Sequence, residues 1–193
     1  MPSAEHSGSL RTAGRRRRFD RQTIEELIDG KVTWPTLHEM LSTFKDPDRF
    51  DQVIEILQSR MPYPDQILLP FAFHLNVVQT ADGRRIIKSD CGFEFGDYRE
   101  NWKEQALVYV RNTAETIREI YPNFMGADPA WQEYREYYCP SCGTQLEVET
   151  VPPWYQPVNR SYPPVHSFIP DLETFYQEWL GRPLPTMPAD SSD

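Results

Sequence analysis

The chain has 193 residues, of which 39% are hydrophobic and 13% aromatic, so it can form a core and is not a wholly disordered protein. It lacks any apolar run of about 18 residues, and no apolar stretch follows its basic N-terminal residues, so we expect neither a membrane-spanning helix nor a secretory signal. An odd cysteine count of three favours reduced thiols in the cytoplasm over a disulfide framework.

The net charge of −9 is unevenly distributed along the chain. The first 21 residues hold six arginines and two acidic residues, a net +4, so the remainder holds −13. We expect residues 1–19 to form a disordered basic tail in which Arg15 to Arg18 are solvated. An acidic body repels phosphate backbones, so we predict that the protein has no nucleic-acid partner.

Residues 20–60 are predicted to form a helical lobe of three short amphipathic helices, each with apolar residues three and four positions apart. Asp20 is the expected cap of the first helix, and the second is expected to begin at Pro35. Asp46 is the expected N-cap of the third helix, with Pro47 at its first position.

Residues 61–151 are predicted to form a β-rich core. The run 71–79 favours a strand, followed by a turn at 81–83 and a partner strand at 84–88. The other elements expected here are a strand at 106–110, a short helix capped by Thr113 and running to Tyr121 with Ile117 and Ile120 facing inward, and a strand at 146–151.

The sequence Cys-Pro-Ser-Cys-Gly at 139–143 has the spacing of a metal-binding knuckle. Two residues between the thiolates let both sulfurs face one point, and the following glycine tolerates a positive φ. Cys91, followed by a glycine, is half of a second knuckle, but Ser89 stands where its other cysteine would be. We therefore predict a zinc-ribbon site with Cys91, Cys139 and Cys142 as ligands, because thiolates favour zinc over magnesium or calcium.

The fourth ligand of this site is open, and Ser89, Asp90, His74 and His166 are the candidates. His74 alternates with the apolar positions of the predicted strand, so our default interpretation is an ordinary sheet histidine. An alternative for the whole site is that it has lost its metal and keeps its shape, with the thiols packed as small hydrophobic groups.

Residues 152–193 are predicted to be a proline- and aromatic-rich extension that ends in an amphipathic helix from about 170 to 180. Proline prevents residues 152–170 from forming a sheet of their own, so their aromatic rings need another surface to cover them. We therefore expect a protein partner. The apolar stripe of the helix comprises Leu172, Phe175, Tyr176, Trp179 and Leu180.

Motifs of catalysis are missing from the sequence. There is no phosphate-binding loop, no dinucleotide fingerprint, no Gly-X-Ser-X-Gly elbow and no histidine pair with zincin spacing. We therefore predict no catalytic and no cofactor-binding residues apart from the metal ligands.

Five motifs resemble the gamma subunit family of acetone carboxylases, and they lie at residues 36–42 (TLHEMLS), 45–50 (KDPDRF), 55–62 (EILQSRMP), 137–143 (YYCPSCG) and 175–181 (FYQEWLG). The resemblance implies a small structural or coupling subunit of a heteromeric, ATP-dependent ketone carboxylase. It also implies that hydantoinase-like large subunits bind ATP and Mg or Mn. The family pattern Cys-X-Cys-Gly-His departs here to Ser-Asp-Cys-Gly-Phe at 89–93, so one zinc ligand and a histidine are absent.

Two other functions remain open at this point. One is a stand-alone zinc-ribbon interaction protein that contacts nucleic acid through Arg15 to Arg18. The other is a metal-dependent enzyme in which water occupies the position beside the three cysteines. In all three cases the expected fold class is α+β, with a helical lobe, a zinc-ribbon-like antiparallel core and a C-terminal helix.

Overall fold

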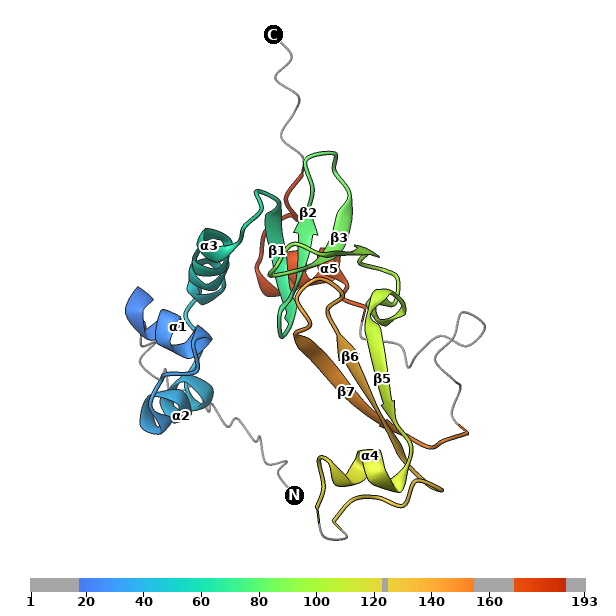
Figure 1. The fold of residues 1–193 in the computed structure, drawn as a ribbon. Coiled ribbons are helices and arrows are strands. Elements are labelled where there is room, and N and C mark those ends of the chain that lie inside the picture. The colour runs from blue at the N-terminus through green and yellow to red at the C-terminus, as the bar shows by residue number, and fades with distance from the viewer. Residues whose placement is uncertain (1–17, 123–124, 155–168, 187–193) are drawn as a thin grey trace, which may run out of the picture. The chain divides into compact units, whose positions relative to one another are not determined.

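A computed structural model describes residues 18–122, 125–154 and 169–186. It has the predicted α+β fold, with short helices and antiparallel sheets (Figure 1). The chain divides into two compact units, residues 1–57 and 58–193, which we describe separately. The four segment boundaries expected from the sequence remain predictions. Within the described ranges, no helix combines the length and the apolar character needed to cross a membrane.

The first unit contains α1 (Arg21–Ile28), α2 (Trp34–Ser42) and most of α3 (Arg49–Arg60). Asp20 caps α1 as predicted, because its carboxylate accepts a hydrogen bond from the Thr23 backbone N–H at 2.8 Å. Apolar side chains from all three helices meet in a small core. That core comprises Phe19, Ile24, Met40 and Ile56.

The prediction that Asp46 caps α3 is wrong, because the helix begins at Arg49. Asp46 is buried, and its carboxylate accepts hydrogen bonds from the Phe19 backbone N–H at 3.4 Å and the Arg49 guanidinium at 3.3 Å. The guanidinium of Arg49 also lies over the Phe19 ring. Asp46 therefore joins the start of the helical unit to α3.

The second unit contains two antiparallel sheets. The first has the strand order β1-β2-β3-β4, and the second has the order β5-β6-β7. Its strands are β1 (Gln66–Ala72), β2 (Leu75–Gln79), β3 (Arg85–Ser89), β4 (Glu94–Asp97), β5 (Leu107–Arg111), β6 (Glu133–Tyr138) and β7 (Gln145–Val151). Its helices are a 3₁₀ turn at Trp102–Gln105, α4 (Ala114–Arg118), α5 (Leu172–Thr174) and a π-helical turn at Phe175–Trp179.

Residues 71–79 do not form the single strand predicted from the sequence. β1 ends at Ala72 and β2 begins at Leu75, so the run contains a tight hairpin turn. His74 lies in that turn with a φ of 61°, which is uncommon for a residue other than glycine. Its interpretation as an ordinary sheet histidine is therefore wrong.

One hydrophobic core joins both sheets of the second unit. Phe95 packs edge-on against Trp102, which packs edge-on against Tyr137, with ring centroids 5.7 and 6.2 Å apart. These contacts connect the first sheet to the second through the 3₁₀ turn. Cys139 is completely buried in the same core. The second knuckle cysteine, Cys142, is exposed.

The predicted C-terminal helix is present, but its turns change in type. Asp171 caps it through the Thr174 backbone N–H, and the Tyr176 hydroxyl donates to the Leu68 carbonyl at 2.8 Å. Because residues 175–179 form a π-helical turn, their angular spacing differs from that of an α-helix. Trp179 is consequently 78% exposed and does not belong to the buried stripe that was predicted.

The predicted helix after β5 is also shorter than expected. Thr113 caps α4, and Ile117 is buried as predicted. Because α4 ends at Arg118, Ile120 lies beyond the helix and is exposed, so its predicted inward orientation is wrong.

Candidate metal centre

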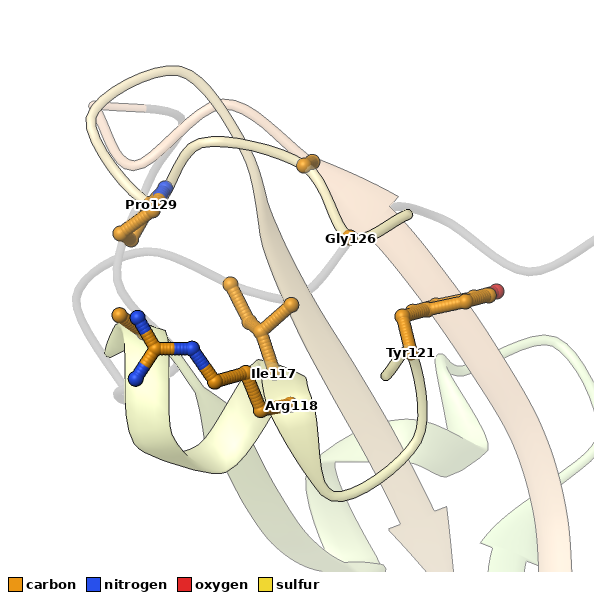
Figure 2. A pocket seen from close by; sticks show the side chains of 7 residues that line it. Ile117, Arg118, Tyr121, Gly126 and Pro129 are labelled. Carbon is orange, nitrogen blue, oxygen red and sulfur yellow. The ribbon is translucent and has the colours of Figure 1, made fainter. Parts of the chain in front are cut away.

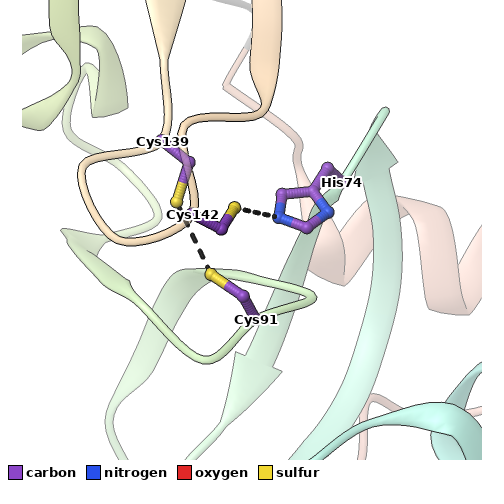
Figure 3. A group of neighbouring side chains, drawn as sticks. All are labelled: His74, Cys91, Cys139 and Cys142. Atoms are coloured by element: carbon purple, nitrogen blue, oxygen red, sulfur yellow. Dashed lines mark hydrogen bonds between the residues drawn. The ribbon is translucent and has the colours of Figure 1, made fainter.

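Four side chains that could bind a metal ion gather in the second unit (Figure 3). They are His74, Cys91, Cys139 and Cys142, and their ligand atoms all lie within 4.8 Å of one another. Within the described ranges this is the one group of at least three potential metal ligands that lies so close together. The three cysteines expected from the sequence are thus adjacent, and a histidine from the β1–β2 turn joins them.

Cys139 and Cys142 come from the turn between β6 and β7. The Gly143 backbone N–H donates to the Cys139 carbonyl at 2.9 Å, and the Cys139 N–H donates to the Thr144 carbonyl at 2.9 Å. Gly143 has a φ of 71°, the left-handed conformation that glycine adopts without steric cost. The knuckle sequence therefore folds as the spacing predicted, with both sulfurs available at one side of the turn.

Cys91 comes from the turn between β3 and β4. Its sulfur lies 3.6 Å from the sulfur of Cys139 and 3.1 Å from the hydroxyl oxygen of Ser89. Ser89 is buried, and its hydroxyl accepts a hydrogen bond from the Phe93 backbone N–H at 3.0 Å. Ser89 therefore supports the turn and contacts the sulfur of Cys91.

His74 supplies the imidazole of the cluster. Its Nε2 lies 3.2 Å from the Cys142 sulfur, and its Nδ1 lies 3.3 Å from an oxygen of Asp90. The other oxygen of Asp90 accepts a hydrogen bond from the Asn76 side chain at 2.7 Å. A carboxylate behind a ligating histidine fixes the tautomer and orientation of the ring, which is the usual arrangement around protein metal sites.

The surroundings shift the protonation equilibria of the cluster in both directions. Burial opposes ionisation of Cys91, but hydrogen bonds with Ser89 and His74 lower the pKa of its thiol to about 6. Hydrogen bonds with Thr144 lower the pKa of Cys142, whereas burial raises the pKa of Cys139. Burial also disfavours the charged form of His74, but hydrogen bonds with Cys91 and Cys142 raise its pKa overall. The pKa values of Cys91 and His74 therefore depend on hydrogen bonds within the cluster itself.

The donor set fits a tetrahedral metal ion. Bonds of about 2.3 Å to sulfur and about 2.0 Å to nitrogen place neighbouring ligand atoms of a tetrahedron roughly 3.3–3.8 Å apart. The separation of 3.6 Å between the sulfurs of Cys91 and Cys139 lies in that range, and the 3.2 Å between the Cys142 sulfur and the His74 nitrogen is slightly shorter. Three sulfurs and one nitrogen complete four-coordination, which is typical of structural sites without an open position.

The structure distinguishes among the candidates for the fourth ligand. His74 lies in the cluster, whereas Asp90 contacts the far nitrogen of the imidazole and Ser89 hydrogen-bonds within its turn. His166 lies outside the described residues. No local sequence signal identifies His74, because its position depends on a hairpin turn hidden in an apolar run.

Comparison with known proteins gives consistent matches. Residues 61–180 match the family described as acetone carboxylase gamma subunit. The acetone carboxylase gamma subunit of Xanthobacter autotrophicus is 48% identical over 168 residues, which cover 86% of this chain and 96% of that protein. The acetophenone carboxylase beta subunit of Aromatoleum aromaticum is 33% identical over 66 residues, which cover 33% of this chain and 51% of that protein.

Proposed function

The chain belongs to the acetone carboxylase gamma subunit family, and we propose that it is the small, non-catalytic subunit of a heteromeric ATP-dependent ketone carboxylase. The observation that carries the proposal is the 48% identity to a curated gamma subunit over 96% of its length. The complex would convert a ketone and bicarbonate to a β-keto acid. ATP and Mg or Mn would bind to larger, hydantoinase-like subunits.

A structural role for this subunit agrees with the chemistry of its side chains. The potential ligands form one closed set of four, which leaves no position for a substrate. We propose that His74, Cys91, Cys139 and Cys142 hold zinc, the ion that a thiolate-rich tetrahedral site favours. Bound zinc would cross-link the turns β1–β2, β3–β4 and β6–β7. The reduced thiols also agree with a cytoplasmic location for the complex.

Exposed aromatic side chains support a role in a hetero-oligomer. Trp154 and Trp179 are 66% and 78% exposed, although side chains of this size usually bury much of their surface. Aromatic anchors of this kind carry much of the binding energy at stable interfaces. Tyr155, Tyr162 and Phe168, which belong to the aromatic-rich run 152–170, lie outside the described residues.

The proposal can be tested by producing the chain with and without the larger subunits of the carboxylase from the same organism. We expect a stable complex that contains this chain and turns over ketone with ATP, whereas the chain alone is inactive. Elemental analysis should give about one zinc per chain, and Cys142→Ser should lower the zinc content. A chain that stays monomeric beside the larger subunits would favour the stand-alone zinc-ribbon protein.

A further inference from the structure

The connection between β5 and β6 carries a surface pocket, and β6 separates this connection from the β6–β7 turn of the cysteine cluster (Figure 2). Its volume is about 360 Å³, in the range of pockets that accept a small group of apolar atoms. α4 supplies Ile117 and Arg118, and the loop opposite supplies Gly126 and Pro129. Tyr121 closes one side of the pocket.

The walls of this pocket are held in place by specific contacts. A capping box at Thr113 and Thr116 fixes the start of α4, and the Arg111 guanidinium donates to the Thr116 carbonyl at 2.9 Å. Opposite, the loop passes so close to the helix that a Cβ on Gly126 would lie 2.5 Å from a methyl carbon of Ile117. The pocket is therefore shaped by the packing of the fold.

Arg118 gives the pocket a positively charged side chain. Its guanidinium forms no ion pair within 4 Å with a described residue and interacts only at longer range with the Glu115 carboxylate, whereas Arg111 nearby binds both Glu119 and Glu136. The chain as a whole carries a net charge of −9. An arginine beside an apolar pocket, without a close ion pair, is complementary to a carboxylate adjacent to an apolar group.

Apolar side chains border the pocket on the surface. Met125 and Trp131 are 79% and 70% exposed, and Ile120 and Tyr121 are also exposed. Trp131 packs edge-on against Trp154, with ring centroids 5.8 Å apart. Exposed apolar groups of this kind mark interaction sites, and a small molecule in the pocket would leave them exposed, whereas a protein partner can cover them.

We propose that residues 114–122 and 125–131, which we call the α4 surface, form the docking surface for a larger subunit of the carboxylase. An apolar side chain of that subunit enters the pocket, and a neighbouring carboxylate of the same subunit pairs with Arg118. The apolar border then becomes buried around this contact. This inference rests on the proposed function and adds the surface through which the complex assembles.

The test measures the affinity of the chain for the larger subunits with two variants of the α4 surface. Arg118→Glu reverses the charge, and Ala127→Phe fills the pocket. We expect each variant to weaken binding roughly 10- to 100-fold, because a complementary charge or an anchor site is lost. Arg99→Glu is the matched control, because Arg99 is an exposed arginine on another loop. The affinity of this variant for the larger subunits should stay near that of the wild type.

Two further measurements keep the outcomes separate. Circular dichroism and the thermal midpoint show whether each variant folds. Hydrogen exchange maps the contact surface on the wild-type chain itself, so it does not depend on the folding of a variant. The residues of the α4 surface should exchange more slowly in the complex than in the free chain. Suppose that the wild-type chain assembles with the larger subunits, that the exchange rates of the α4 surface do not change, and that both folded variants bind with normal affinity. This result would overturn the proposed docking surface but leave the proposed function standing. If wild-type chain does not assemble at all, the proposed function fails as well.

Discussion

The two ends of the β5–β6–β7 sheet differ in the length of the connection and in the burial of its side chains. At one end, the short β6–β7 turn contributes Cys139 and Cys142 to the ligand cluster, and Cys139 is completely buried. At the other end, the long β5–β6 connection contains α4 and leaves Met125 and Trp131 exposed. At the first end, the side chains of the ligand cluster contact one another closely. At the second end, apolar side chains are exposed. One sheet thus has the cysteine cluster at one end and exposed apolar side chains at the other.

Between these ends, the sheet contains a buried polar network. The Lys103 ammonium is 2% exposed and contacts carboxylate oxygens of Glu147 and Glu149, each at 2.6 Å. The Tyr137 hydroxyl donates to the other oxygen of Glu149 at 2.7 Å, and burial raises the pKa of Tyr137. Because burying the charges is itself costly, such a network is weak evidence for added stability.

The largest predicted effect would come from breaking the cysteine end. Cys139→Ser, or removal of bound metal by a chelator, should destabilise the second unit by about 4 kcal/mol or more, because a structural metal contributes directly to folding. The thermal midpoint should fall by roughly 8–16 °C. Trp131→Ala, at the other end, should leave the midpoint nearly unchanged. A chelator without effect on the midpoint of a zinc-loaded chain would contradict the prediction.

A smaller effect is expected from the carboxylate behind His74. Asp90→Asn keeps the size of the side chain but removes the charge that orients the imidazole, so metal affinity should fall roughly 10- to 100-fold. Competition with a chromogenic chelator measures that affinity. Asp97→Asn is the control, because Asp97 is a strand carboxylate that binds Arg99 on the surface. Equal metal affinities of the two variants would show that Asp90 does not support His74 as a ligand and only stabilises the turn.

Features encoded by neighbouring residues are predictable from this sequence, whereas features that depend on distant contacts are not. The knuckle at 139–143 is encoded by spacing within five residues, so its two cysteines were predictable. His74 was assigned to a strand because an apolar run concealed the hairpin turn around it, and a positive φ at histidine has no sequence signature. Its role in the cluster depends on contacts that the sequence does not display.

The errors on the helices have a related cause. The prediction for Trp179 assumed α-helical periodicity, which the π-helical turn at Phe175–Trp179 replaces. Ile120 was expected to face inward because the end of α4 was placed too far along the chain. Asp46 was expected to cap a helix that begins later, at Arg49. Element type was therefore predictable, and the exact ends and turn types depended on tertiary packing.

The two ends of the sheet each contain a glycine that is needed for a different reason, backbone conformation at Gly143 and space at Gly126. Gly143 has open space around it but a φ of 71°, so Gly143→Ala should cost about 1–2 kcal/mol in unfolding free energy through backbone strain. Gly143→Asn should cost less, because asparagine tolerates that conformation. At the other end, Gly126 lacks space, so Gly126→Asn should be no better than Gly126→Ala. Urea unfolding of the four variants measures these differences, and the same ranking at both sites would contradict this explanation.

The smallest expected effect concerns the cap of α4. Thr113→Ala removes the side-chain acceptor for the Thr116 backbone N–H and should cost about 1 kcal/mol. The thermal midpoint should fall by roughly 2–4 °C, with the zinc content unchanged. Thr113→Ser, which keeps the acceptor, should behave nearly as the wild type. A loss of zinc in Thr113→Ala would show that the two ends of the sheet are coupled.

The order of the four ligands along the chain has a consequence for biosynthesis. His74 and Cys142 are 68 residues apart, and Cys91 and Cys139 are 48 residues apart. At typical translation rates of about 5–20 residues per second, Cys91 is synthesised roughly 2–10 s before Cys139. During that interval the nascent chain holds a histidine and a thiol without the knuckle that completes the set. The first sheet is therefore synthesised before all four potential ligands are present.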